Sequence, residues 1–167
     1  MLCVISALCR IETQAYGANR NNQRRYAYVK LNGVAVWQAS WLGEFPRHRG
    51  ANVIIVNPSN CTRQEWRNFD THAVRPDNAA RLRDYLQGLS DGTVLVGVSC
   101  DEASKELDAA EATLSELGAD VSDVGWRGAW VFVAEKGDPT KTVLDKQLTE
   151  TAANEPQPHV NVSLGGV

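Results

Sequence analysis

The sequence predicts an α/β domain in which several strands are accompanied by two amphipathic helices. Short apolar runs bounded by turn residues alternate with two stretches of helical periodicity. The chain has 167 residues, of which 43% are hydrophobic and 22% charged, as in an ordinary globular domain. Each helical stretch has a single apolar stripe, so we expect both helices to cover the faces of a sheet.

The strands are indicated by alternation and by turn signals. Residues 26–37 alternate around Asn32-Gly33, a favoured pair for a two-residue hairpin turn. Residues 52–56 form a short apolar run that ends at Asn57-Pro58, and residues 63–71 are a candidate to pair back on it. Further buried strands are expected at 94–98 and 129–133, and a candidate edge strand at 159–167.

The helices are indicated by apolar residues three or four positions apart. The first stripe consists of Ala79, Leu82, Leu86 and Leu89, with Asp77 as a plausible cap. The second stripe consists of Ala103, Leu107, Ala110, Leu114 and Leu117, and Gly118 stands where a helix would end.

We expect one domain over residues 1–150 and a polar tail over 151–167, part of which is the candidate edge strand. A net charge of −3 does not favour a nucleic-acid partner. No apolar run approaches the roughly 20 residues that cross a bilayer, so we expect no membrane insertion. Residues 1–12 lack the basic start and the long apolar run of a signal peptide, so we expect a strand there; if the protein is secreted, its leader is not in this chain.

Four cysteines are present, at positions 3, 9, 61 and 100. They form no CxxC pair and no Cys/His spacing typical of zinc, so we expect no metal or other cofactor. Cys61 follows one buried strand and Cys100 ends another, which predicts a Cys61–Cys100 disulfide and leaves Cys3 and Cys9 to pair locally. Sequons at Asn60 and Asn161 fit a secreted glycoprotein.

Three charged residues stand at the ends of predicted strands. Arg49 precedes the first of these strands, Asp101 follows the second and Arg127 precedes the third. If the middle strand runs opposite to the other two, all three side chains reach one edge of the sheet. Guanidinium groups donate hydrogen bonds, a carboxylate accepts them, and the neighbouring Trp126 offers a flat apolar face. Sugars need that mixture, because their hydroxyls donate and accept while their C–H faces pack on aromatic rings.

Other roles are open for the same residues. Asp101 could cap the helix that follows, Arg127 could form a structural ion pair with it, and Trp126 could belong to the core. A catalytic pair of Asp101 and Glu102 is a poor hypothesis, since glycosidase carboxylates lie about 5–10 Å apart across a bond and adjacent side chains diverge. We therefore expect no enzyme activity.

The motifs "RGANVIIVNP", "NFDTHA", "DGTVLVGVSCDE", "LSELGADVSDVGWRGAWVFVAEKG" and their order resemble the interleukin-like EMT-inducer domain over roughly residues 26–137. The resemblance implies a compact β-sandwich-like core of two sheets flanked by two helices, without catalysis. Within this family, the sequence is most similar in type to the stem domain of protein O-mannose β-1,2-N-acetylglucosaminyltransferase. That stem domain binds N-acetylglucosamine. Carried over from that domain's Arg-Gly, Asp-Glu and Trp-Arg motifs, the sugar-binding residues would be Arg49, Asp101, Glu102, Trp126 and Arg127.

Together these observations predict a free-standing, secreted lectin for glycans that end in N-acetylhexosamine, mainly N-acetylglucosamine. The alternative is a secreted cytokine-like ligand that acts through a protein receptor. A single shallow sugar site binds weakly and lectins compensate by multivalency, so we expect a homo-oligomer.

Overall fold

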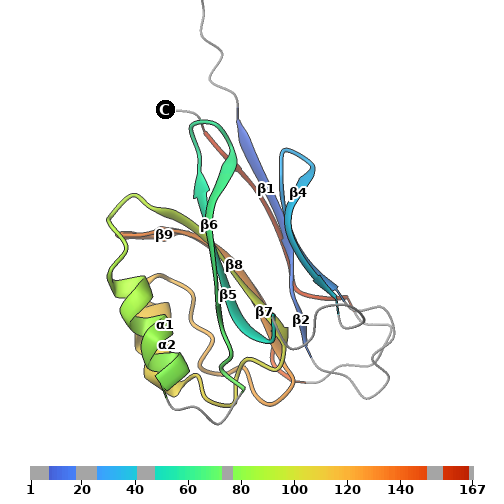
Figure 1. Ribbon diagram of the computed structural model, residues 1–167, viewed down its shortest axis with the longest axis vertical. Helices are drawn as coiled ribbons and strands as arrows, with labels where there is room; N and C mark the ends of the chain where they lie inside the picture. The colour runs from blue at the N-terminus through green and yellow to red at the C-terminus, as the bar shows by residue number, and fades with distance from the viewer. Residues whose placement is uncertain (1–7, 18–25, 41–47, 73–76, 150–155, 166–167) are drawn as a thin grey trace, which may run out of the picture.

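The computed structural model describes residues 8–17, 26–40, 48–72, 77–149 and 156–165, and it has three layers (Figure 1). A four-stranded antiparallel sheet packs on one face of a six-stranded sheet, and two helices cover the other face of the larger sheet. This architecture confirms the predicted sandwich-like core of two sheets flanked by two helices.

The smaller sheet has the order β10-β1-β3-β4. Its strands are β1 (Cys9–Gln14), β3 (Tyr26–Leu31), β4 (Val34–Ser40) and β10 (His159–Leu164). The predicted hairpin is confirmed, because β3 and β4 pair across a turn in which Asn32 and Gly33 both have positive φ. The C-terminal strand β10 pairs with β1 and lies at the edge of this sheet, as the sequence indicated.

The larger sheet has the order β6-β5-β7-β8-β9, and the short strand β2 also pairs with β7. Its strands are β2 (Tyr16–Gly17), β5 (Gly50–Asn57), β6 (Thr62–Phe69), β7 (Val94–Asp101), β8 (Ala129–Glu135) and β9 (Asp138–Gln147). The predicted pairing of residues 63–71 with the preceding strand is confirmed as β5–β6.

The direction of the three central strands determines where the candidate site residues lie. β7 lies between β5 and β8 and runs antiparallel to both. Gly50 at the start of β5 therefore faces Cys100 near the end of β7, and β8 begins at the same edge. The strand directions on which the site prediction depends are thus confirmed.

The two helices are α1 (Asp77–Gln87) and α2 (Asp108–Glu116). The first begins at Asp77, the residue suggested as its cap, and the second begins five residues later than its apolar spacing predicted. The backbone between 103 and 106 is held by tertiary bonds instead: Thr71 donates its hydroxyl to the Ala103 carbonyl, and the Glu106 amide donates to the Thr71 carbonyl, both at 2.9 Å. Among the described residues, no helix is long and apolar enough to cross a membrane.

The alternation along the strands produces two cores. On β5, Ile54 and Val56 join the core between the two sheets, whereas Val53 and Ile55 join the core beneath the helices. The core between the sheets is rich in valine, and the helix-side core contains the leucines of both helical stripes together with Trp130 and Phe132.

The predicted cysteine pairing is wrong. Cys9 at the start of β1 bonds to Cys61 in the β5–β6 turn, with their Cα atoms 5.1 Å apart, and Cys100 is a buried free thiol. The antiparallel arrangement explains the error, because Cys61 follows the far end of β5 while Cys100 lies beside its beginning, roughly a strand length of 25 Å away. Cys3 lies outside the described residues, and burial raises the pKa of the Cys100 thiol well above its ordinary value.

Both predicted glycosylation sites are accessible. Asn60 is exposed in the β5–β6 turn beside the disulfide, where its side-chain oxygen accepts a hydrogen bond from Thr62 at 2.7 Å. Asn161 is exposed on the outer face of β10. Their use remains a prediction.

Candidate functional site

Three strand ends bring Arg49, Asp101 and Arg127 to one edge of the larger sheet. Arg49 directly precedes β5, Asp101 is the last residue of β7, and Arg127 lies two residues before β8. The charges of both arginines act on Asp101 and favour its ionised form. The structure thus brings together the three residues that the strand ends predicted.

Asp101 is a mostly buried carboxylate in an unusual backbone conformation. It is 8% exposed and has a φ of 62°, a region that residues with a Cβ rarely adopt. Burial raises the pKa of Asp101 to about 6, against the lowering effect of Arg49 and Arg127, and the neighbouring Glu102 raises it further. Asp101 does not cap the following helix, because α2 begins at Asp108 with Leu107 as its N-cap residue.

Arg49 is held in place by Asp70, which follows β6. Its Nε and a terminal nitrogen donate to the two carboxylate oxygens of Asp70 at 2.9 and 2.8 Å, the two-pronged geometry that suits guanidinium and carboxylate groups. The β5 and β6 backbones approach closely beside this pair because residue 50 is glycine. The φ of Gly50 is +91°, and a Cβ atom there would lie 2.3 Å from the Phe69 carbonyl oxygen. Strands β5 and β6 therefore fix the direction from which Arg49 reaches the site.

Trp126 and Arg127 lie on a turn that leads into β8. Trp126 is 52% exposed, so it is not a core residue. One side of its ring packs on His72, with ring centroids 5.6 Å apart, and the guanidinium of Arg127 lies 5.8 Å from the indole centroid. Arg127 has the same left-handed φ of 62° as Asp101. Burial, and to a lesser extent the charge of Arg49, lowers the pKa of His72 and favours its neutral form.

Glu102 lies beneath this turn and is only 2% exposed. One carboxylate oxygen accepts from the amide and the hydroxyl of Ser104, at 2.7 and 2.6 Å, and the other accepts from the amide of Arg127. The Ser104 hydroxyl also bonds to the Gly125 carbonyl at 3.0 Å. Both oxygens of Glu102 therefore engage the protein itself, and they tie the end of β7 to the turn that carries Trp126 and Arg127.

Sequence reasoning missed three residues of this site. Asp70 belongs to the "NFDTHA" motif, and its place after a strand next to Arg49 was the signal that could have identified it. His72 lies two residues further on and supports Trp126. Gly17 pairs with Asp101 through the short parallel strand β2, and no local pattern in the sequence predicts that pairing.

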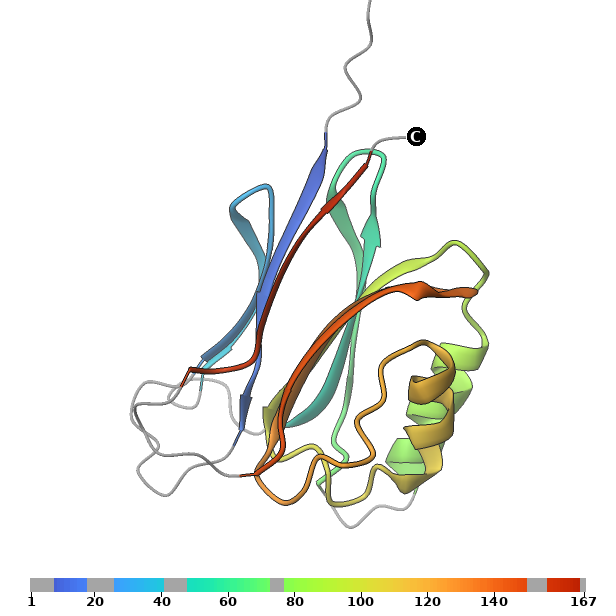
Figure 2. The same ribbon diagram turned by 180° about the vertical axis from the view of Figure 1, so that it is seen from behind.

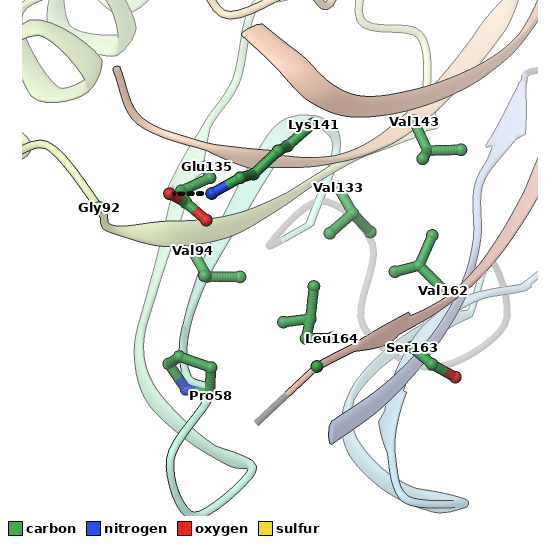
Figure 3. A pocket seen from close by; sticks show the side chains of 11 residues that line it. Pro58, Gly92, Val94, Val133, Glu135, Lys141, Val143, Val162, Ser163 and Leu164 are labelled. Carbon is green, nitrogen blue, oxygen red and sulfur yellow. Dashed lines mark hydrogen bonds and ion pairs between the residues drawn. The ribbon is translucent and has the colours of Figure 1, made fainter. Parts of the chain in front are cut away.

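A cavity of about 720 Å³ lies elsewhere, at the opposite end of β7, and is lined mostly by aliphatic side chains (Figure 3). None of Arg49, Asp101 and Arg127 lines it. Its size favours that end as a ligand site, but its lining lacks the convergent donors, acceptors and aromatic face that the Asp101 end provides. Chemistry rather than volume therefore identifies the Asp101 end as the candidate polar site.

Comparison with known proteins places these residues in a family. The family model described as "Interleukin-like EMT inducer" matches residues 49–138, which include every described residue of the candidate site except Gly17. "Protein FAM3C" of Bos taurus is 34% identical over 102 residues, covering 60% of this chain and 44% of that protein.

A second relative has a different size. "Cell migration-inducing and hyaluronan-binding protein" of Homo sapiens is 33% identical over 100 residues, which are 59% of this chain but 7% of that protein. The chain thus spans less than half the length of these relatives, and the similarity concerns only part of each. Since the family model matches more than half of the chain, this chain belongs to the interleukin-like EMT inducer family.

Proposed function

We propose that this chain is a lectin that binds terminal N-acetylhexosamine, mainly N-acetylglucosamine. The binding site is formed by Arg49, Asp101 and Arg127, at the strand ends of the larger sheet. The observation that carries the proposal is the convergence of two guanidinium groups and one mostly buried carboxylate next to an exposed indole. This combination suits an uncharged ligand with several hydroxyls and an apolar ring face.

Each residue has a distinct role in this proposal. Asp101, when ionised, accepts hydrogen bonds from two sugar hydroxyls, and charge-assisted bonds of this kind are stronger than neutral ones. The two arginines donate to other sugar oxygens, with Arg49 held in direction by Asp70. Trp126 packs against the C–H face of the ring. Burial of Asp101 limits competition from water for its oxygens.

Glu102 takes a positioning role rather than the direct sugar contact that the family resemblance implied. Both of its oxygens already accept hydrogen bonds from Ser104 and Arg127. Its contribution is to hold the turn that presents Trp126 and Arg127 at a fixed distance from Asp101.

The name of one relative supports a glycan ligand. That relative is called hyaluronan-binding, and hyaluronan is a polysaccharide. The shared region is a small part of that protein, so the name supports the class of ligand and not the linkage. The Cys9–Cys61 disulfide is typical of oxidising compartments, which fits the proposal that the lectin is secreted.

A glycan array followed by calorimetric titration with N-acetylglucosamine tests the proposal. We expect hits on glycans with terminal N-acetylhexosamine and at least a tenfold loss of affinity on Asp101→Asn. Asn161→Gln, an exposed substitution on β10, is the matched control and should leave the affinity unchanged. An array without hits, or equal binding by the parent and Asp101→Asn, would reject the site.

A second function, a cytokine-like ligand for a protein receptor, is favoured only by the description of the matching family. The same array separates the two hypotheses, because only the lectin requires a sugar to bind the isolated chain. We propose neither function as catalytic.

A further inference from the structure

We infer that the outer edge of β10, which pairs with no strand other than β1 among the described residues, accepts a short β-strand from a partner protein. This strand would complete the smaller sheet over the aliphatic cavity at the other end of β7. The strand would carry aliphatic side chains at alternate positions and a lysine or arginine at the end nearest Glu135. This inference is independent of the proposed sugar site.

The two sheets of the sandwich differ in width on this side. β9 and β10 are the edge strands of their sheets, and Figure 2 shows both on the same side of the molecule. At one end they are joined, since the His159 amide donates to the Asp145 carboxylate at 2.8 Å. Toward the other end lies the cavity of about 720 Å³, lined by residues 162–165 of β10 and the segment after it. The smaller sheet thus leaves part of β9 uncovered.

The cavity has the lining that an inserted strand would require. Val162 and Leu164 of β10 point into it and Ser163 points away, as alternation along a strand dictates (Figure 3). Across the cavity stand Val133 of β8 and Val143 of β9, and Val143 is 44% exposed. A strand paired with β10 would lie about 4.8 Å from it and about 10 Å from the larger sheet, with every second side chain directed at these valines.

Among the described residues, the edge of β10 has little protection against pairing with another strand. The edge strand β6 carries the exposed charges Arg63 and Arg67, and the guanidinium of Arg63 covers the Val36 carbonyl of β4 at 2.7 Å. β9 carries two exposed charged side chains, Lys141 and Asp145. Proteins protect free strand edges with such charges. On β10, by contrast, the described outward residues are His159, Asn161 and Ser163, which include no acid, lysine or arginine.

Charged residues at the rim of the cavity indicate which side chain the bound strand carries at the end nearest Glu135. The Lys141 ammonium lies 2.7 Å from Glu135 and 3.5 Å from Asp138, so one cation faces two carboxylates. The excess negative charge favours a basic side chain at that end of the strand and disfavours an acidic one. A short occupant is expected, because only residues 162–165 border the cavity before β10 meets β9 at Asp145.

The test uses the full chain and synthetic peptides. The probe is the acetylated peptide TKTVTVTKT, whose lysines and valines lie on one face of a strand. We expect slowed hydrogen exchange at the amides of residues 162–165 when the probe binds. Replacing both lysines by glutamate should weaken binding at least fivefold. Two further probes carry N-methyl groups on alternate backbone nitrogens, one at the odd positions and the other at the even positions. One of the two should lose at least tenfold in affinity, since strand pairing needs the amides that face β10.

Two substitutions of exposed valines form a matched pair. Val143→Glu places a charge in the cavity and should weaken probe binding at least tenfold. Val34→Glu, at the first residue of β4, which is 66% exposed, should not change it. Asp101→Asn should leave probe binding unchanged even where it abolishes sugar binding, so failure of one site is distinguishable from failure of the other.

Three results would overturn the inference. The first is absence of binding at about 1 mM probe. The second is equal binding by both backbone-methylated probes, which would mean that the cavity takes apolar groups without strand pairing. The third is protection of residues 162–165 that rises with protein concentration in the absence of probe, which would mean that a second copy of this chain occupies the edge.

Discussion

A Cβ atom at Gly17 would lie 2.2 Å from the carbonyl oxygen of Arg127, so no other residue fits beside that carbonyl without moving it. Gly17 also pairs with Asp101 through β2. One glycine therefore contacts the turn that carries one arginine of the candidate site and the strand that carries its carboxylate.

Substitution of this glycine is the first prediction. Gly17→Ala should lower the melting temperature and weaken N-acetylglucosamine binding at least tenfold, because β2 or the Arg127 backbone must shift. Gly165→Ala is the control, since a Cβ atom at Gly165 would meet no atom within 4 Å. The measurement is a thermal melt beside a calorimetric titration of each variant. Normal binding by Gly17→Ala would show that the Arg127 turn is not fixed by β2.

The protonation of Asp101 gives the second prediction. Its pKa is about 6 in the folded chain and ordinarily 3.8, so between these values the folded chain binds a proton that the unfolded chain does not. The contribution of Asp101 to the free energy of unfolding therefore falls as pH rises through this window, by up to about 3 kcal/mol. Asn tolerates the left-handed conformation at this position and has no charge to bury.

Asp101→Asn should thus be more stable than the parent above pH 6 and nearly equal to it below pH 4. Denaturant unfolding at both pH values measures the difference. Asp101→Ala should show less of this gain, because the left-handed conformation costs alanine about 1–2 kcal/mol. If the difference in unfolding free energy between the parent and Asp101→Asn does not change with pH, Asp101 is not a buried carboxylate that titrates in this range.

The third prediction is that sugar affinity depends on the ionisation of the Asp101 carboxylate. Below about pH 6 Asp101 takes up a proton and no longer accepts two hydrogen bonds with its full charge. The affinity for N-acetylglucosamine should therefore fall as the pH is lowered from 7 to 5, and that dependence should vanish in Asp101→Asn. Calorimetric titrations at several pH values provide the check; a flat profile for the parent would exclude Asp101 as the acceptor.

The fourth prediction concerns the indole. Trp126 is half exposed, so Trp126→Ala should leave the melting temperature unchanged while it weakens sugar binding by about 1 kcal/mol, or roughly fivefold. Trp126→Phe should retain most of the affinity, because a flat aromatic face remains. Equal affinities for the parent and the Ala variant would mean that the sugar does not stack on this ring.

The fifth prediction concerns the disulfide. Cys9 and Cys61 are 52 residues apart in sequence, and closure of a loop of this length stabilises the folded chain by about 4 kcal/mol in the chain-entropy treatment. A Cys9→Ser, Cys61→Ser double variant should lose that amount, and reductant should have no further effect on it. In Cys100→Ala, by contrast, reductant should still destabilise the chain. Peptide mapping without reduction should recover the Cys9–Cys61 peptide.

The expected homo-oligomer remains a prediction from sugar valency alone. Light scattering at micromolar concentration measures it directly, and a monomer would count against it. The strand-addition inference does not depend on the result.

The strand ends and the fold class were predictable because they follow from local patterns. Apolar runs indicated β5, β7 and β8, and the charges next to them identified Arg49, Asp101 and Arg127. Elements fixed by tertiary contacts were not predictable. The start of α2 is delayed by bonds from Thr71, and the partner of Cys61 comes from a strand that pairs in the other sheet. The left-handed conformation of Asp101 likewise has no signature in the neighbouring residues.

The family match begins at Arg49, after β1, β2, β3 and β4, and ends before β10. A fragment trimmed to residues 49–138 would therefore lose the whole smaller sheet and expose the valine-rich face of β5, β7 and β8 to water. Such a fragment should aggregate rather than fold, because large exposed apolar faces associate. In this chain, the recognisable core of the family depends on flanking segments that the family pattern does not describe, and expression boundaries should be drawn around both sheets.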